Sequence, residues 1–379
     1  MRWNWSPFWR RSSEDGTFVP PPAAEPATFR ITPDRSARQA VVERHELALA
    51  RLAARPDEAV AMAVAIPFCA AHCLHCDRSV HAAQGAEVVD AYVDNLLLEA
   101  HLLGRRTGTR RPVRELHFGG GTANDLSSMQ LVRLVGGLHD EWQLPAHEAM
   151  SIDCDPRRAS RTQLDLLCEL GFQRVSFGVG DLDLAVQHAV GRHHSSDLVV
   201  DVCALAREAG FERIHLALMI GLPMQQLAGW RRTLQSVIAM APDRVTVQHF
   251  AHRPAQVPVH RSIDAATLPD AALCRTLWET AASALGAAGY LPIGADAFER
   301  PVGDGADLLP GAVPAEHAPP VLLGLGVGAT SVIDHDRFWS EAELTPWQAA
   351  LAEGRLPVLR AARVEGGGTP TPPPAPRTS

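Results

Sequence analysis

The sequence predicts an α/β fold in which a parallel sheet with helical crossovers forms an open, partial (β/α)6 barrel. Six short runs rich in β-branched and apolar residues each precede a helical pattern, an alternation typical of parallel sheets. Three helical patterns end in Gly followed by an apolar residue, which is a usual helix-stop signal. Six units are too few to close the ordinary eight-fold barrel, so we expect the barrel to stay open.

Each element of this alternation can be placed on the chain. The expected strands are residues 62–66, 114–118, 150–154, 174–179, 213–221 and 244–250, and the helices that follow the first five cover 88–104, 127–142, 161–171, 196–210 and 227–241. A further helix at 270–289 leads into the strand-like segments 290–298 and 322–333. We expect these last elements to form a C-terminal extension packed on the barrel.

The flanking segments complete the expected organisation. Residues 36–59 have the pattern of an amphipathic helix that ends near Arg55-Pro56. Both ends of the chain are rich in proline, and the C-terminal end also in glycine. The predicted parts are a flexible arm (1–28), a helical segment (29–61), the barrel core (62–255), the extension (256–364) and a disordered Gly/Pro-rich tail (365–379).

Composition excludes several classes of function. The net charge of −8 gives no basic field for nucleic acid, and no apolar run reaches the roughly 18 residues of a membrane span. An odd count of 7 cysteines fits a reducing cytoplasm better than a disulfide framework. The chain contains no lysine, which excludes a pyridoxal-phosphate Schiff base and a P-loop lysine on a nucleotide phosphate.

A loop directly after the first expected strand carries Cys69, Cys73 and Cys76, in the run "IPFCAAHCLHC". Three cysteines at this spacing allow three interpretations. They are incidental, they bind zinc with His72 or His75 as a fourth ligand, or they hold an iron–sulfur cluster. Three thiolates leave one iron of a 4Fe–4S cube open to another ligand. Ligands gather at the carboxyl ends of parallel strands, so the position of the loop favours a functional site and the cluster in particular.

The chain resembles a known family at several collinear motifs. C-x-x-x-C-x-x-C after "IPF" resembles the radical S-adenosylmethionine (SAM) enzymes, in which SAM fills the open iron site. Further motifs follow in the same order as in one family of these enzymes: "LHFGGGT", "DPR", "GFQRVSFGVGDLDLAVQHAVGR", "GLP", "DRVTVQHFAHRP" and "GYLPIGADAF". Residues 60–335 are therefore similar to the oxygen-independent coproporphyrinogen III oxidases. The resemblance implies a 4Fe–4S cluster and SAM as cofactors, with the cluster on the three cysteines.

The resemblance also implies further site residues. In the family the glycine turn holds the methionine end of SAM, which carries over to Gly120, Gly121 and Thr122. Arg192 falls on the arginine that reaches toward SAM. Asp153 stands where the family has glutamate, with the same charge and one methylene fewer.

The implied activity is oxidative decarboxylation of coproporphyrinogen III, in which two propionate side chains become vinyl groups in porphyrin and haem biosynthesis. The expected partners are a porphyrinogen or other small-molecule substrate and an electron donor of the flavodoxin or ferredoxin type. We expect no nucleic acid partner, no membrane span and a cytoplasmic location.

Departures from the family pattern leave two alternatives open. The family's additional cysteine after the third cluster ligand is Arg78, a SAM-contacting glutamine is Gly180, and an aspartate on a later strand is Ala217. The family's helical C-terminal domain has no counterpart before the Pro-rich tail, so the chain is expected to be a divergent member that lacks it. The alternatives are a radical SAM enzyme with a different substrate, for example a methyltransferase, and a non-catalytic haem-trafficking or regulatory paralogue.

Overall fold

The structure is a computed structural model. It describes residues 35–70, 73–78, 80–82, 85–108, 110–145, 149–293, 296–301 and 321–363. The predicted arm and tail, residues 1–28 and 365–379, lie outside the described residues.

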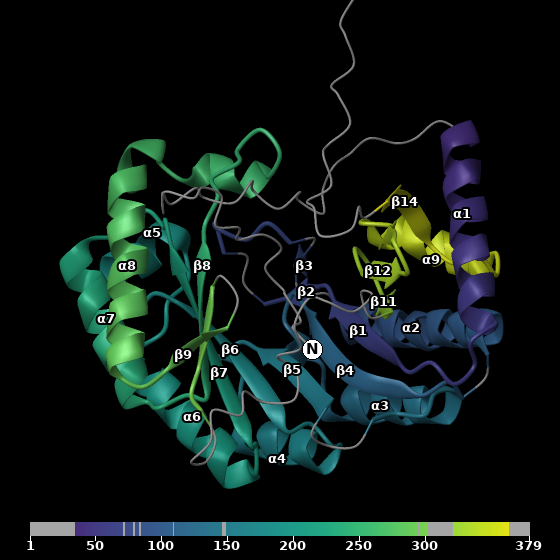
Figure 1. Ribbon diagram of the computed structural model, residues 1–379, viewed down its shortest axis with the longest axis horizontal. Coiled ribbons are helices and arrows are strands. Elements are labelled where there is room, and N and C mark those ends of the chain that lie inside the picture. The colour runs from purple at the N-terminus through teal and green to yellow at the C-terminus, as the bar shows by residue number, and fades with distance from the viewer. Residues whose placement is uncertain are drawn as a thin grey trace, which may run out of the picture.

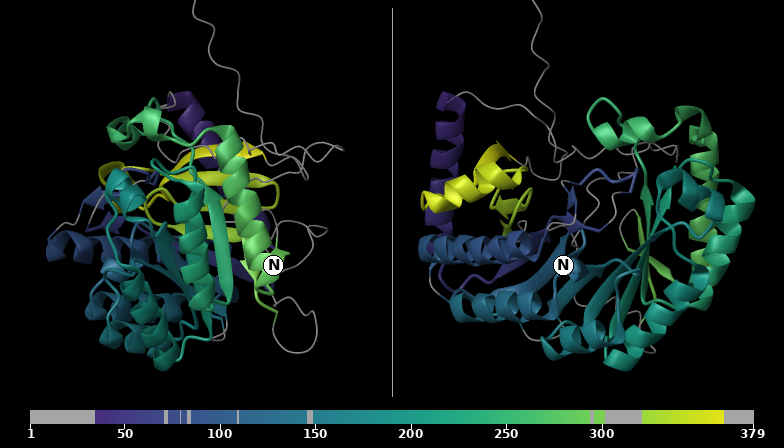
Figure 2. Two further views of the ribbon diagram at one scale, coloured as in Figure 1. Left: turned by 90° about the vertical axis from the view of Figure 1, so that its left-hand side faces the viewer. Right: turned by 180° about the vertical axis from the view of Figure 1, so that it is seen from behind.

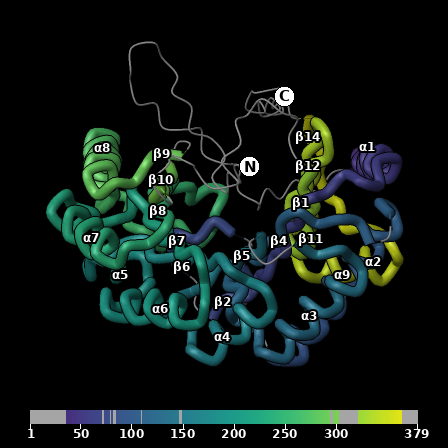
Figure 3. The backbone as a smooth tube through the Cα atoms, turned by 60° about the horizontal axis from the view of Figure 1, so that its bottom comes forward, coloured from purple at the N-terminus to yellow at the C-terminus, as the bar shows by residue number. Residues whose placement is uncertain are grey.

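Six parallel strands lie side by side and form the open barrel that the sequence predicts. In spatial order they are β1 (Val60–Ile66), β4 (Val113–Gly120), β5 (Met150–Cys154), β6 (Arg174–Gly180), β7 (Arg213–Ile220) and β8 (Arg244–His249). The crossover helices are α2 (Ala86–Thr107), α3 (Ser128–Glu141), α4 (Arg161–Glu169), α6 (Ser196–Ala209) and α7 (Leu227–Ala239). They follow one another along the outer side of the curved sheet, as Figures 1 and 3 show.

These bounds confirm the predicted strand–helix alternation to within a few residues. One short helix, α5 (Leu184–Val190), was not predicted. It begins at Asp183, whose side chain accepts a hydrogen bond from the backbone N–H of Ala185. It ends at Gly191, where φ is +65°. Seven residues are too few to establish a helical period in the sequence.

The segments after the barrel extend its sheet at both edges. Beside β1, β11 (Leu322–Leu325) runs parallel, and β12 (Thr330–Ile333), β13 (Asp336–Ser340) and β14 (Val358–Arg363) follow antiparallel, with α9 (Leu344–Ala352) between the last two. Beside β8, β10 (Ala297–Glu299) and β9 (Leu291–Ile293) pair antiparallel, with α8 (Ala271–Ala287) alongside. The extension is therefore bonded into the sheet, where it covers strand edges that would otherwise be unpaired.

The first helix, α1 (Arg35–Ala53), ends just before the predicted Arg55-Pro56 boundary and packs beside the C-terminal strands (Figure 2). Arginines at its C-terminal end reach the β12–β13 turn. Arg51 and Arg55 contact Asp334 at 3.1 and 2.8 Å, and Arg51 also contacts Asp336 at 3.1 Å. These ion pairs join the first described helix to the C-terminal strands.

The two faces of the barrel strands differ in character. Along β7 the buried residues Leu216, Leu218 and Ile220 alternate with the less buried His215 and Ala217. The less buried residues face the barrel interior. On this face the strand registers place polar and small residues side by side: Ala63 with His117, His117 with Ser151, Asp153 with Ser176, and Gly178 with Ala217.

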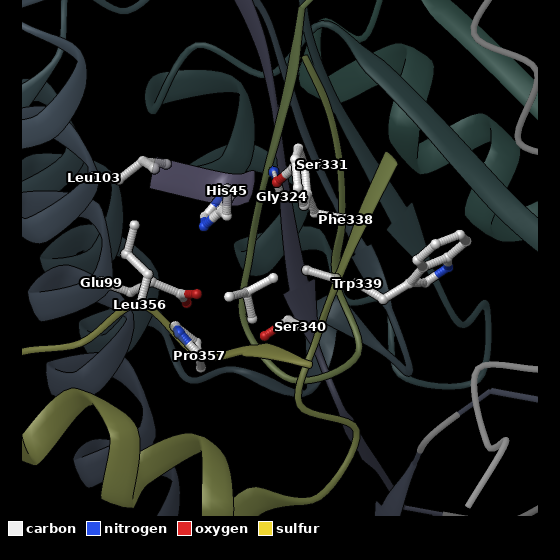
Figure 4. Close-up of a pocket in the computed structure, with 12 residues that line it drawn as sticks. His45, Glu99, Leu103, Gly324, Ser331, Phe338, Trp339, Ser340, Leu356 and Pro357 are labelled. Atoms are coloured by element: carbon white, nitrogen blue, oxygen red, sulfur yellow. Dashed lines mark hydrogen bonds between the residues drawn. The ribbon is translucent and has the colours of Figure 1, made fainter. Parts of the chain in front are cut away.

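A buried carboxylate joins α2 to the C-terminal strands. Glu99 is 3% exposed, and its Oε2 accepts hydrogen bonds from the Gly326 backbone N–H at 2.7 Å and the Trp347 indole N–H at 3.2 Å. It lines a small pocket with His45 and Ser340 (Figure 4). Burial raises the pKa of Glu99 to about 8, although the two hydrogen bonds oppose this shift.

Glu99 should make the stability of the protein depend on pH. Its folded-state pKa, about 8, lies above the ordinary 4.5, so the folded state binds the extra proton between these values. This contribution to the free energy of unfolding is fully present below pH 4.5 and is lost as the pH rises through 8. We expect Glu99→Gln to flatten the decline between pH 5 and 8, measured by denaturant unfolding. The exposed Glu353→Gln serves as control, and parallel curves for Glu99→Gln and wild type would refute this role.

Candidate functional site

The three-cysteine loop starts at the carboxyl end of β1 and crosses the mouth of the barrel. It begins with the short strand β2 (Phe68–Cys69), which pairs with β3 (His81–Ala82). Farther along, the backbone N–H of Leu74 donates to the carbonyl of Val190 at the end of α5, at 2.9 Å. The loop therefore contacts elements on both sides of the barrel mouth, as the sequence predicts for a site at the strand ends.

The loop begins against the segment after β4. The Cys69 Sγ lies 3.0 Å from the Thr122 Oγ1. The backbone N–H of Ala70 donates to the Asp125 carboxylate at 2.9 Å, and Arg158 pairs with the same carboxylate at 2.7 Å. Thr122, which was assigned from the resemblance, thus lies beside a cysteine of the loop.

The glycine turn approaches the cysteine segment through its backbone. The N–H of Gly121 donates to the carbonyl of Ile66 at 2.6 Å, and the N–H of Thr122 donates to the carbonyl of Phe68 at 2.8 Å. Gly120 has φ of +104°, and a Cβ there would lie 2.8 Å from the Ile66 nitrogen. A Cβ on Gly121 would lie 2.8 Å from the Phe68 oxygen. Side chains at these two positions would push the turn away from the loop.

The middle cysteine lies in a positively charged environment. Arg192 donates to the Cys73 Sγ at 3.5 Å, to the Asp155 carboxylate at 3.2 Å and to the carbonyl of Gly178 at 2.6 Å. Arg157 binds the same Asp155 carboxylate through Nε and Nη2 and also lies against Cys73. Burial would raise the pKa of Asp155, but the bonds from Arg157 and the charge of Arg192 hold it below its usual value.

Two thiols of the loop, Cys69 and Cys76, resist ionisation. Burial raises the pKa of Cys69, and the contact with Thr122 opposes this rise. Burial also raises the pKa of Cys76, to about 11. The charge of Cys73 raises the pKa of Cys69 further, and the charge of Cys69 does the same for Cys76. The three sulfurs therefore lie close enough to interact electrostatically. A bound cation would replace these protons and favour the thiolate forms.

Asp153 lies in the barrel interior below the glycine turn. The His117 ring bridges two neighbours, with Nε2 at 3.5 Å from the Asp153 Oδ2 and Nδ1 at 2.8 Å from the Ser151 Oγ. Burial would raise the pKa of Asp153, but His117 and Arg78 favour its charged form, and the pKa is about 2. Arg78 donates to the carbonyl of Gly120 at 2.8 Å. This carboxylate therefore stays ionised across the physiological range.

A small pocket lies under the middle of the loop. It is lined by His75, Gly180, Asp181, Gln187, Arg192 and Leu222. Within the described residues the Nδ1 of His75 is buried and has no hydrogen-bond partner. Burial lowers the pKa of His75 to about 3, so the ring is neutral. Gly180, with φ of +72°, leaves one wall of this pocket without a side chain.

The structure brings together most of the predicted site residues. Cys69 contacts Thr122, Cys73 contacts Arg192, and Gly121 bonds to the start of the loop. Asp155 and Arg157 entered the sequence reasoning only through the motif "DPR", which did not indicate the charge pairing beside Cys73. A charged Asp-x-Arg at the carboxyl end of a barrel strand was the available signal.

Two features are absent from the residues that the structure describes. Among these residues, which leave out 71 and 72 of the loop, no group of three His, Cys, Asp or Glu side chains is placed to hold a single metal ion. Within the same residues, none of the helices combines the length and apolar character that crossing a membrane requires.

Comparison with known proteins gives consistent matches. Residues 64–237 match the radical SAM superfamily. The chain is 33% identical over 325 residues to the oxygen-independent coproporphyrinogen III oxidase of Pseudomonas aeruginosa, covering 83% of this chain and 70% of the relative. The Synechocystis enzyme of the same name is 33% identical over 236 residues, covering 62% of this chain and 51% of that protein.

A solved structure gives the same result. The coproporphyrinogen III oxidase from Escherichia coli, described as a radical SAM enzyme, superposes with a TM-score of 0.76 at 29% identity. The match covers 85% of this chain and 75% of that one. For several relatives the chain spans little more than half of their length, for example 55% of the curated Escherichia coli sequence. The predicted fold and the family resemblance are both confirmed, and the chain belongs to the oxygen-independent coproporphyrinogen III oxidase family of the radical SAM superfamily.

Proposed function

We propose that the protein is a radical SAM oxidoreductase that decarboxylates coproporphyrinogen III or a closely related propionate-bearing porphyrinogen. One observation carries the proposal: the loop of Cys69, Cys73 and Cys76 crosses the barrel mouth in backbone contact with the glycine turn. Family membership supports the same activity.

The residues present fit a 4Fe–4S cluster held by Cys69, Cys73 and Cys76. These cysteines form no disulfide, are partly or fully buried, and lie in the loop that follows β1. Arg157 and Arg192 beside Cys73 would offset the negative charge of three thiolates. With SAM on the open iron, such a cluster supplies one-electron reduction and a radical able to abstract hydrogen.

The remaining site residues suit the binding of SAM. Gly120, Gly121 and Thr122 form a turn next to the loop, and its two glycines carry no side chain that would keep a ligand away. Asp153 supplies a permanent negative charge for an ammonium group, because its pKa is about 2. Arg192 lines both the Cys73 side of the site and the pocket under the loop. These residues would bind and orient SAM and exclude water.

The proposal extends to the partners and the location. The one-electron chemistry needs a donor, for which a flavodoxin- or ferredoxin-type protein is proposed. A cytoplasmic location is proposed because the 7 cysteines include three that must remain reduced to hold a cluster.

Cysteine substitution should separate cluster ligands from other thiols. We expect anaerobically reconstituted wild-type protein to hold about four irons and four sulfides per chain. Cys69→Ala, Cys73→Ala and Cys76→Ala should each abolish this, because each removes one thiolate. Cys168→Ala and Cys203→Ala should not, since these cysteines lie on α4 and α6 away from the loop. Stoichiometric zinc without labile sulfide in the wild type would disprove the cluster.

The activity itself can be assayed with two separate products. Reduced, reconstituted protein is incubated anaerobically with SAM and coproporphyrinogen III, and 5′-deoxyadenosine and vinyl product are both quantified. We expect both products, and we expect Arg192→Gln to lower both because the guanidinium contacts Cys73 and the pocket. Deoxyadenosine without vinyl product would indicate another substrate. Neither product from protein with a full cluster would indicate a non-catalytic paralogue.

A further inference from the structure

The two edges of the barrel core meet at its mouth through loops. β1 and β8 lie at opposite ends of the row of six parallel strands and are not neighbours in the sheet. The cysteine loop follows β1, and residues 250–263 follow β8. The Arg253 Nη2 lies 3.3 Å from the Asp77 Oδ2, which joins residues that are 176 positions apart.

Arg253 belongs to a loop that holds it in place. Its backbone N–H donates to the His260 Nδ1 at 3.0 Å, and its carbonyl accepts from the Val257 N–H at 2.8 Å. The rings of His252 and His260 are stacked with centroids 5.9 Å apart. The side chain of Arg253 is 14% exposed. Most of the side chain is thus covered by a loop that is itself held by hydrogen bonds.

Asp77 directly follows the last cysteine. The backbone N–H of Cys76 donates to the carbonyl of Cys73 at 3.1 Å, which closes a turn over residues 73–76 directly before Asp77. A second contact joins the same two loops, since the rings of His75 and Phe250 lie edge to face at 6.5 Å. The turn carrying Cys76 is therefore held from the β8 side of the barrel, whereas Cys69 is held from the β4 side.

The contact is strong enough to matter because it is partly buried. Exposed ion pairs contribute little to stability, but a buried charge that loses its partner is costly. Arg253 is mostly buried and Asp77 about half exposed, at 45%. Loss of either partner should therefore let the Cys76 turn move, because the ion pair that ties this turn to the loop after β8 would be gone.

We propose that Arg253 is a positioning residue for the iron–sulfur cluster. Through Asp77 it fixes the turn that carries Cys76, and it thereby sets how firmly the third thiolate holds its iron. Neither residue touches the cluster in this assignment. The inference rests on the proposed function, because it presupposes a cluster on the three cysteines.

The test uses four variants and one control. Arg253→Gln and Asp77→Asn each break the pair, Arg253→Lys keeps the charge, and the double variant Asp77→Arg/Arg253→Asp reverses it. Arg161→Gln is the control, because it removes the exposed Arg161–Glu208 pair on the outer surface. For each reconstituted protein, the rate of iron loss to a chelator and the midpoint potential of the cluster are measured. Hydrogen exchange across residues 73–78 is followed in the iron-free proteins.

We expect both single neutral variants to lose iron roughly tenfold faster than wild type, with a shifted potential and faster exchange across 73–78. Arg253→Lys and the charge-reversed double variant should return the rate of iron loss, the potential and the exchange most of the way to wild-type values. The control should match wild type. Wild-type rates, potential and exchange in Arg253→Gln would overturn the inference while leaving the proposed function intact. Equal losses in the single variants and the reversed pair would also overturn it. A wild-type protein that takes up no iron would overturn both.

Discussion

The glycine turn packs directly against residues 66–68, where the chain enters the cysteine loop. This contact determines how the site is built. Two backbone hydrogen bonds, from Gly121 to Ile66 and from Thr122 to Phe68, fix the end of β4 against the start of the loop. A Cβ at Gly120 or Gly121 would lie 2.8 Å from that backbone. The contact therefore requires glycine at both positions for steric reasons. It also brings the Thr122 Oγ1 to 3.0 Å from the Cys69 Sγ.

The distribution of charge follows from this arrangement. The parallel strands bring their carboxyl ends to one edge, so residues after β5 and β6 reach the same loop. Asp155 lies between Arg157 and Arg192 and orients both guanidinium groups beside Cys73. Asp153 stays ionised in the barrel interior. The site thus offers positive charge near the thiols and negative charge below the glycine turn, which suits an anionic cluster and a zwitterionic ligand.

Local patterns in the sequence predicted the parts of the structure that depend on local physics. Strand–helix alternation predicted the barrel, and the position of the three cysteines directly after a strand predicted that their loop lies at the strand ends. The short α5 and the strands β13 and β14 were missed, since a helix of 7 residues and strands of 5 and 6 residues carry little periodicity. The Asp155–Arg192 and Asp77–Arg253 pairs were missed because they join residues 37 and 176 positions apart. Only the folded sheet brings such residues together.

The central claim is that three thiols hold a four-iron cluster with one iron open to SAM. Electron paramagnetic resonance of the reduced, anaerobically reconstituted protein tests it most directly, with spectra recorded before and after SAM is added. The account predicts the signal of a reduced 4Fe–4S cluster and a clear change in its g values when SAM binds the open iron. A cluster signal that SAM leaves unchanged, or no cluster signal at all, would contradict it.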